Sequence, residues 1–294
     1  MSAADHPQWQ RIAARKGRLA EGVEVARLLP TRERRMVGAW CFLDHLGPVA
    51  FPAGQGMHVG AHPHTHLQTF TWMIEGEILH RDSLGSEQVI RAGQVNLMTA
   101  GHGIAHTEDT VRDGDRLHAV QLWIALPQAV ADQPPAFEHY AQVPQWREQG
   151  CDWVLMAGHY AGHTAPTRLF SPLLGMEVLA SETCEVQLTL DASFEYGLVA
   201  LEGGFAVENM ALAADELLYL PPGGSAVHVR LQASTRLLVL GGEPLGESVL
   251  MWWNFLGADW VSIRAYRAQW EQGDVRFGPP LQALQHRIAA PALP

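Results

Sequence analysis

The sequence contains few cysteines and no long apolar segment. Its three cysteines, Cys41, Cys151 and Cys184, lie far apart without a Cys-x-x-Cys pair, which argues against a disulfide framework and is typical of a reducing compartment. No apolar run has the length of a membrane span, and residues 1–10 lack the apolar core of a signal peptide. We therefore expect a soluble, cytoplasmic protein that does not bind a membrane.

Positive charge is scarce as well. The chain has 20 Lys and Arg against 31 Asp and Glu, which gives a formal net charge of -11. Because an acidic surface repels phosphate groups, we do not expect direct binding to nucleic acid. The sequence also offers no Ser-His-Asp arrangement and no glycine-rich phosphate loop. Its hydrophobic content of 47% over 294 residues suffices for one large domain or two ordinary ones.

Short segments of apolar, aromatic and β-branched residues follow one another from Val23, separated by turns. The expected strands include residues 23–28, 40–43, 69–74, 77–81, 88–90, 94–98 and 117–126, with a turn at 44–48. Many short strands between such turns predict an antiparallel sandwich or barrel. Residues 1–22 are expected to form a solvated arm. Residues 259–272 are expected to form an amphipathic helix that Asp259 caps and Gly273 ends.

The second half of the chain repeats features of the first. Leu201-Glu202-Gly203 resembles Ile74-Glu75-Gly76, and residues 214–223 resemble residues 92–101. This repetition predicts two tandem β-domains: residues 1–130 with a metal site and residues 151–294, which include the helix. Residues 131–150, which contain prolines, are the expected connector. Because the second half has no His-x-His and His228 has no carboxylate two residues later, we expect that half to be metal-free.

The candidate metal ligands lie between His62 and Glu108. His62-Pro63-His64 and His106-Thr107-Glu108 each place two such ligands two residues apart. On an extended strand, side chains at positions i and i+2 point to the same face. Two neighbouring strands of this kind can hold one ion between them. The sequence therefore predicts a mononuclear metal site with His62, His64, His106 and Glu108 as ligands.

The ligand types indicate which metal the site would take. Three imidazoles and one carboxylate leave an octahedral ion two free positions for other ligands. Such ligation suits Fe(II), which we expect first, and also Mn, Co, Ni or Cu. Zn would instead favour a closed tetrahedral site with a structural role. We prefer the open, exchangeable site and keep the structural zinc site as the alternative.

The spacing of these residues resembles that of cupins and, among them, the pirin family. The first cupin motif is similar to Gly56-x5-His62-x-His64-x3-Gln68-x7-Gly76, and a stretched second motif to Gly93-x5-Thr99-x-Gly101-x4-His106. Segments 42–48, 76–85, 98–106 and 241–245 are also similar to pirins, so the resemblance extends from about residue 23 to residue 245. It implies an all-β bicupin, with two jelly-roll barrels and a C-terminal helix. The family's ligand set falls on His62, His64, His106 and Glu108.

The resemblance implies two functions of different kinds. Some pirin-like proteins have quercetin 2,3-dioxygenase activity, in which a flavonol chelates the metal and is cleaved by dioxygen. In that scheme Glu108 is the catalytic residue that accepts the phenolic proton. The alternative is an iron-dependent, redox-sensing regulatory cofactor that acts through a protein partner and has no physiological catalysis.

Several residues near the site require separate interpretations. The chain has Thr65-His66 where pirins often carry Arg-Gly, and Gln68 where most cupins carry a ligand Glu, so the substrate pocket is expected to differ. His66 has the strand parity of His64 and faces the site unless a bulge turns it away. The remaining histidines nearby, His45, His58, His80, His102 and His118, are expected in turns or at the surface.

Overall fold

A computed structural model describes residues 9–20, 23–279 and 287–294 of the chain. In this part of the chain the structure consists mainly of β-strands, with one α-helix, α1 (Trp260–Gln272), and two short 3-10 helices, η2 (Gln128–Val130) and η3 (Val275–Phe277). The expected all-β fold with a C-terminal helix is therefore confirmed. None of the described helices combines the length and apolarity that crossing a membrane would require.

The chain divides into two compact units, and neither unit is one continuous segment. The described residues within 1–16, 26–45 and 142–245 form unit 1, and those within 17–25, 46–141 and 246–294 form unit 2. Both units therefore take residues from the N-terminal part of the chain, and unit 2 also takes the C-terminal tail. This division differs from the expected one, which placed the tail with the second β-domain.

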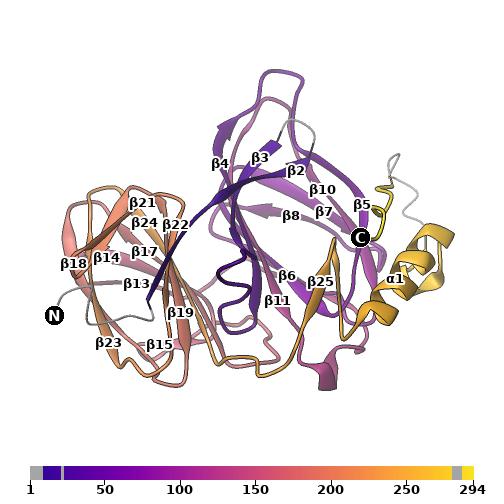
Figure 1. Ribbon diagram of the computed structural model, residues 1–294. Coiled ribbons are helices and arrows are strands. Elements are labelled where there is room, and N and C mark those ends of the chain that lie inside the picture. Colours follow the sequence, from indigo (N-terminus) through magenta and orange to yellow (C-terminus); the bar gives the residue numbers. More distant parts are fainter. Residues whose placement is uncertain (1–8, 21–22, 280–286) are drawn as a thin grey trace. The chain divides into compact units, whose positions relative to one another are not determined.

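Unit 2 is built on two sheets, most of whose strands are labelled in Figure 1. The seven-stranded sheet has the order β12 (Ala136–Tyr140), β9 (Val95–Thr99), β6 (Leu67–Glu75), β11 (Arg116–Ala125), β4 (Trp40–Ala50), β3 (Val23–Leu29) and β2 (Arg15–Ala20). Parts of β4, β3 and β2 belong to unit 1. The four-stranded sheet has the order β5 (His58–His64), β10 (Ile104–Thr110), β7 (Glu77–Asp82) and β8 (Glu87–Arg91). Buried side chains from both sheets, among them Met73, Ile78, Ile90 and Leu117, form one hydrophobic core.

Unit 1 contains a second pair of sheets. The seven-stranded sheet has the order β1 (Gln10–Ala13), β22 (Glu216–Leu220), β19 (Glu195–Glu202), β24 (Thr235–Gly242), β17 (Leu173–Ala180), β14 (Cys151–Ala157) and β13 (Gln145–Glu148). The four-stranded sheet has the order β18 (Cys184–Thr189), β23 (Ala226–Leu231), β20 (Gly204–Val207) and β21 (Met210–Ala213). A short hairpin, β15 (His159–Tyr160) and β16 (His163–Thr164), is added to them.

The two units have the same topology, as the sequence repeat between the two halves predicts. The strand order β5-β10-β7-β8 in unit 2 corresponds to β18-β23-β20-β21 in unit 1. The repeated Glu-Gly pairs lie at equivalent turns, between β6 and β7 and between β19 and β20. Gly76 has a φ of 91° and Gly203 a φ of 74°, a backbone conformation that favours glycine. The structure thus contains two β-domains of the same topology.

The structure corrects two expectations about the N-terminal part of the chain. The solvated arm is wrong for its described residues, because β1 pairs with β22 and Ile12 is buried. Residues 1–8 and 21–22 lie outside the described residues. The expected turn at residues 44–48 is also wrong, since this segment continues β4. The expected connector carries β12, which pairs with β9, and β13, which pairs with β14.

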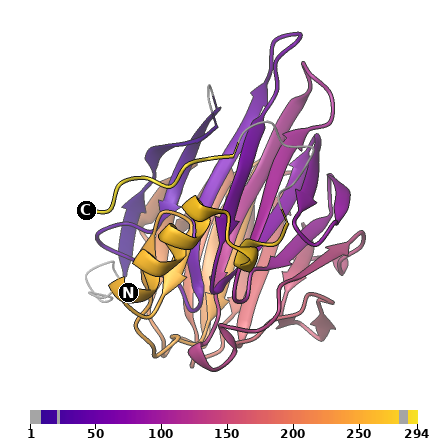
Figure 2. The same cartoon turned by 90° about the vertical axis from the view of Figure 1, so that its right-hand side faces the viewer.

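The C-terminal tail forms a short hairpin and then the expected helix. Strands β25 (Leu250–Trp252) and β26 (Phe255–Gly257) precede α1, which the side chain of Asp259 caps and which Gly273 ends in a left-handed conformation. The helix buries Ile263 and Trp270 in a cluster that includes Phe255 of β26 and Ala105 of β10. Figure 2 shows α1, in gold, in front of the strands of the same unit.

The tail also makes backbone contacts with β5. The N–H of Leu256 donates to the carbonyl of Thr65, and the Thr65 hydroxyl donates to the carbonyl of Leu256. The N–H of Ile288 donates to the carbonyl of Ala61. Because β5 is the edge strand of its sheet, these contacts occupy backbone groups that would otherwise be open to solvent.

Candidate metal centre

Strands β5 and β10 bring the two predicted ligand pairs together. They are antiparallel neighbours, with His106 opposite His62 and Ile104 opposite His64. The register shifts between His106 and Glu108, which marks a β-bulge in this ladder. On the other side of β10, strand β7 continues in regular register. Alternation along each strand puts His62 and His64 on one face of β5 and His106 and Glu108 on one face of β10.

Three imidazoles converge into one cluster. His62, His64 and His106 each offer a ring nitrogen, and these atoms lie within 4.8 Å of one another. The ring centroids of His62 and His106 are 4.3 Å apart, and the His64 centroid lies 5.0 Å from each of the others. Among the residues that the structure describes, no other group of three His, Cys, Asp or Glu meets this distance criterion.

The cluster has the dimensions of a metal-binding site. Two nitrogen ligands at right angles on one ion, each about 2.1 Å from it, are separated by about 3.0 Å. The Nε2 atoms of His64 and His106 are 3.1 Å apart. The donor set and this distance therefore fit a divalent ion held by three imidazoles.

Burial keeps these imidazoles neutral. His64 and His106 are each 1% exposed and His62 is 8% exposed. Burial lowers the pKa of His62 to about 4 and holds the pKa values of His64 and His106 well below the ordinary 6.5, with nearby histidines adding to the shift for His64 and His106. A neutral imidazole has one ring nitrogen without a proton, as a metal ligand requires.

One ring is oriented by the backbone of its own strand. The Nδ1 atom of His62 lies 2.8 Å from the carbonyl oxygen of Gly60. Since a carbonyl only accepts, this nitrogen carries the proton and donates it to the hydrogen bond. The other nitrogen, Nε2, then has the free lone pair that can bind a metal.

The fourth predicted ligand, Glu108, is near the cluster but does not join it. Its carboxylate does not meet the mutual distance of 4.8 Å that defines the three-histidine group. The side chain is 6% exposed, and burial, reinforced by the charge of Asp109, raises its pKa to about 7. The register shift puts Glu108 opposite Val59 instead of Gly60, so the extra residue lies on β5, while β10 keeps its regular alternation against β7.

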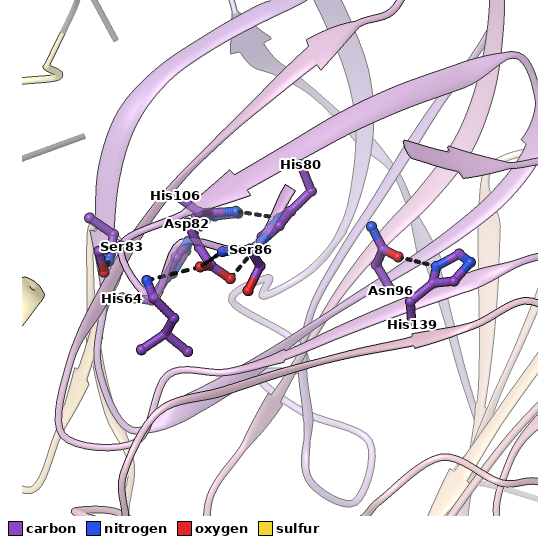
Figure 3. A network of polar contacts seen from close by, with 10 residues as sticks. His64, His80, Asp82, Ser83, Ser86, Asn96, His106 and His139 are labelled. Atoms are coloured by element: carbon purple, nitrogen blue, oxygen red, sulfur yellow. Dashed lines mark hydrogen bonds and ion pairs between the residues drawn. The ribbon is translucent and has the colours of Figure 1, made fainter. Parts of the chain in front are cut away.

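The structure adds two polar residues that the sequence interpretation left out of the site. His80 and Asp82 of β7 lie opposite Glu108 and His106 of β10 in the ladder. His80 is 3% exposed and Asp82 is 1% exposed, so the expectation of a turn or surface position for His80 is wrong. Figure 3 shows the chain of contacts from Asp82 through His80 to His106.

The other nearby histidines lie in different environments. His45 and His118 are buried, contrary to expectation, and His45 contacts Asp215 at 2.7 Å. His58 is exposed, as expected. His66 has a φ of 59°, and its Nε2 lies 2.9 Å from Asp132 and 3.1 Å from the hydroxyl of Tyr266. The local backbone therefore directs His66 to Asp132 and Tyr266.

The corresponding strands of unit 1 carry apolar residues on their buried face. Strand β18, which corresponds to β5, buries Val186 and Leu188, and β23, which corresponds to β10, buries Val227 and Val229. His228 is exposed. These side chains offer no ligand atoms. The absence of metal from the second half stays a prediction, which metal analysis of the protein can test.

Comparison with known protein families gives two matches. Residues 22–124 match the family model Pirin, and residues 175–278 match the model of the Pirin C-terminal cupin domain. Together these ranges span more than half of the chain. The first match contains all four predicted ligands, and the second contains most of unit 1's strands and the helix α1.

Individual proteins are similar along nearly the whole chain. A Pseudomonas aeruginosa protein named "Putative quercetin 2,3-dioxygenase" is 53% identical over 97% of this chain and 90% of its own length. A pirin-like protein of Caulobacter vibrioides is 35% identical over 86% of this chain and 90% of its own. The crystal structure of a quercetin 2,3-dioxygenase from Acinetobacter baumannii is 44% identical, with a TM-score of 0.95 over 97% of this chain and 96% of that one.

Proposed function

Because the chain belongs to the pirin family, we propose that it is a metal-dependent dioxygenase of the quercetin 2,3-dioxygenase type. The relative from Pseudomonas aeruginosa and the solved structure from Acinetobacter baumannii, whose names carry that activity, support the proposal. The observation on which it rests is the cluster of three buried, neutral imidazoles with nitrogens at ligand spacing. The proposed substrate class is a small, flavonol-like aromatic compound.

His62, His64 and His106 are the proposed metal ligands, with Glu108 as a fourth ligand from β10. Recruiting Glu108 needs a movement of its side chain toward the three imidazoles. A bound divalent ion, for which we propose Fe(II) ahead of Mn, Co, Ni, Cu or Zn, would supply Lewis acidity and the redox chemistry of dioxygen. The three imidazoles provide fixed, neutral donors, and their burial excludes bulk water from the donor atoms.

Glu108 is also the proposed proton acceptor. Since its pKa is about 7, its carboxylate can hold or release a proton near neutral pH. A flavonol has a phenolic hydroxyl that must lose its proton before the ring is cleaved. We propose the carboxylate of Glu108, two residues after His106 on β10, as the acceptor of this proton, because the imidazoles donate their lone pairs to the metal.

The test is oxygen uptake by the metal-loaded protein with quercetin, in wild type and two variants. The substitution His106→Ala removes one donor of the cluster, so we expect loss of both the bound metal and the oxygen uptake. The control is His58→Ala on the same strand as His62, because His58 is exposed and lies outside the cluster. It should keep wild-type metal content and uptake. Turnover by metal-free His106→Ala protein would refute the proposal.

The same assay separates the two functions that the family resemblance implies. A dioxygenase consumes oxygen only when both metal and quercetin are present. If metal-loaded wild-type protein binds Fe(II) but consumes no oxygen with quercetin, the catalytic proposal fails. The regulatory alternative then predicts a protein partner whose binding depends on the metal, which a pull-down with loaded and chelator-treated protein measures.

A further inference from the structure

The side chains of His80 and Asp82 extend the histidine cluster into the neighbouring strand. Nδ1 of His106 lies 3.3 Å from Nδ1 of His80, and Nε2 of His80 lies 3.1 Å from Oδ2 of Asp82. The other carboxylate oxygen, Oδ1, accepts the backbone N–H groups of Leu84 and Ser86. Figure 3 shows these contacts as one connected series.

We propose that His80, held by Asp82, is a positioning residue that fixes the tautomer and orientation of His106 for metal binding. The inference rests on the proposed metal site and assigns it a support that acts from β7. Neither residue belongs to the ligand set, and neither needs to touch the substrate. Their contribution is to leave the lone pair of His106 on Nε2, the nitrogen that faces His64.

The chemistry of each contact determines where the protons lie. The carboxylate of Asp82 only accepts hydrogen bonds, so Nε2 of His80 must carry a proton and donate it. In a neutral imidazole the other nitrogen, Nδ1 of His80, is then an acceptor. Nδ1 of His106 must therefore donate to it, which leaves Nε2 of His106 without a proton.

Packing holds the series in place. The ring of His80 stacks on Phe137, with centroids 4.3 Å apart and planes at 13°. Asp82 is buried, and two backbone N–H groups of the turn after β7 fix its carboxylate. Burial opposes ionisation of Asp82, but the hydrogen bonds from His80 and Ser86 outweigh it and lower the pKa of Asp82. The acceptor at the end of the series is thus a carboxylate anion.

The site orients two of its imidazoles by different means. His62 donates its Nδ1 proton to a backbone carbonyl of its own strand, which no side-chain substitution removes. His106 depends instead on two side chains of another strand. Of these two imidazoles, only His106 therefore has an orientation that a substitution outside the ligand set can disturb.

The substitution Asp82→Asn gives the sharpest test, because it preserves the side-chain volume and exchanges donor and acceptor in the hydrogen bond with Nε2 of His80. The two backbone N–H groups of Leu84 and Ser86 still require an oxygen, so the amide NH2 of the new side chain turns to His80. Nε2 of His80 must then accept, its Nδ1 carries the proton, and that proton opposes the Nδ1 proton of His106. We expect the affinity for Co(II), used as probe, to fall about 10- to 100-fold.

Two controls separate this effect from loss of charge and loss of a histidine. Asp113→Asn removes the same charge from an exposed residue of the same unit, and should leave Co(II) affinity within a few fold of wild type. His139→Phe removes an imidazole of the same unit that is hydrogen-bonded to Asn96 but not to the cluster, as Figure 3 shows. It should not change Co(II) binding.

The readouts are the Co(II) dissociation constant, the visible spectrum of the Co(II) protein and the exchangeable ring N–H resonances of the ligand imidazoles. Wild type should show a protected N–H signal from His106, and Asp82→Asn should lose it. His80→Phe, which keeps the ring against Phe137, should also weaken binding and lose this signal, whereas His80→Gln, whose amide oxygen accepts, should recover part of both. These two variants also serve if Asp82→Asn does not fold.

The outcomes are distinct for the inference and for the proposed function. Wild-type affinity and spectrum in Asp82→Asn or His80→Phe would overturn the positioning role and leave the metal site in place. Equal weakening in Asp113→Asn or His139→Phe would overturn it as well, because the effect would then not be specific to this series. If wild-type protein itself binds no Co(II), the proposed metal site fails and the inference fails with it.

Discussion

At the scale of single residues, the site depends on polar side chains that burial forces into definite protonation states. Neutral imidazoles are suitable metal ligands because burial lowers their pKa values. The same burial raises the pKa of Glu108 to about 7, which makes the protonation of this carboxylate sensitive to pH near neutrality. The same low-polarity environment therefore lowers the pKa values of the imidazoles and raises the pKa of the carboxylate.

Substituting Glu108 with Gln should change how stability depends on pH in the metal-free protein. The folded-state pKa of about 7 lies above the ordinary value of 4.5, so the folded state binds this proton more tightly than the unfolded chain. The contribution is complete below pH 4.5 and is lost as pH rises through 7. Glu108→Gln, which does not ionise, should lack this decline and be more stable than wild type above pH 8 by about 3 kcal/mol.

Denaturant unfolding of chelator-treated protein between about pH 5 and pH 9 measures this difference. The control is Glu87→Gln, an exposed glutamate of the same unit, whose curve should stay parallel to wild type. The buried imidazoles, whose pKa values are lowered, make the protein less stable as pH falls into the acid range, which is the opposite pH dependence. This contribution is the same in all three proteins. Parallel curves for wild type and Glu108→Gln would contradict the buried, proton-holding state of this carboxylate.

The sequence indicates some of these residues and not others for a physical reason. The spacing in His62-x-His64 and His106-x-Glu108 is local, so alternation along a strand is enough to place each pair on one face. His80-x-Asp82 has the same spacing, but its importance follows from the pairing of β7 with β10, which is not local. A search for every two-residue pair of this kind would have included it. The register shift of β5 that puts Glu108 opposite Val59 has no such signal.

At the scale of elements, the strands follow the alternation of the sequence closely. Strand β7 covers the expected segment, and the caps of α1 are the expected Asp259 and Gly273. The N-terminal strand β1 was not predicted because its partner β22 lies about 200 residues away, and a short polar segment has little propensity of its own. Long-range pairing, rather than local preference, decides such segments.

The two sheets of unit 1 approach each other at a pair of cysteines. The Sγ atoms of Cys151 on β14 and Cys184 on β18 are 2.9 Å apart, although both cysteines are free. The wide spacing of the cysteines in the sequence gave no indication of this contact. Burial, together with Cys184, raises the pKa of Cys151 to about 12, so the half-buried Cys184 is the thiol that an oxidant reaches.

We expect hydrogen peroxide to join these two thiols slowly into a disulfide, with two thiols and one peroxide giving one S–S bond and two waters. The bond would close a loop with a sequence separation of 33 and raise the unfolding temperature. Mass spectrometry and thiol titration measure the product, in which only Cys41 should still react after unfolding. Cys184→Ser is the control and should form no intramolecular bond. Three free thiols in peroxide-treated wild type would contradict the expectation.

At the scale of the whole molecule, the family resemblance gives two similar barrels, but the chain does not divide between them at one point. Unit 2, which holds the histidine cluster, includes the tail beyond residue 245. That tail packs Phe255 and Trp270 beside β10 and makes backbone contacts with Ala61 and Thr65, next to two of the proposed ligands. The sequence repeat did not indicate this, because the tail has no counterpart in the first half.

The metal site should therefore depend on residues at the opposite end of the chain. Phe255→Ala removes a fully buried ring of the tail, at a cost of about 3 to 5 kcal/mol, and frees the strand that carries His62 and His64. We expect a lower unfolding temperature and weaker Co(II) binding. Phe205→Ala, an equivalent truncation in the core of unit 1, should lower stability while preserving Co(II) affinity, because the proposed ligands lie in unit 2. A chain that ends at residue 245 and still binds Co(II) as tightly as the full chain would contradict this dependence of the metal site on the tail.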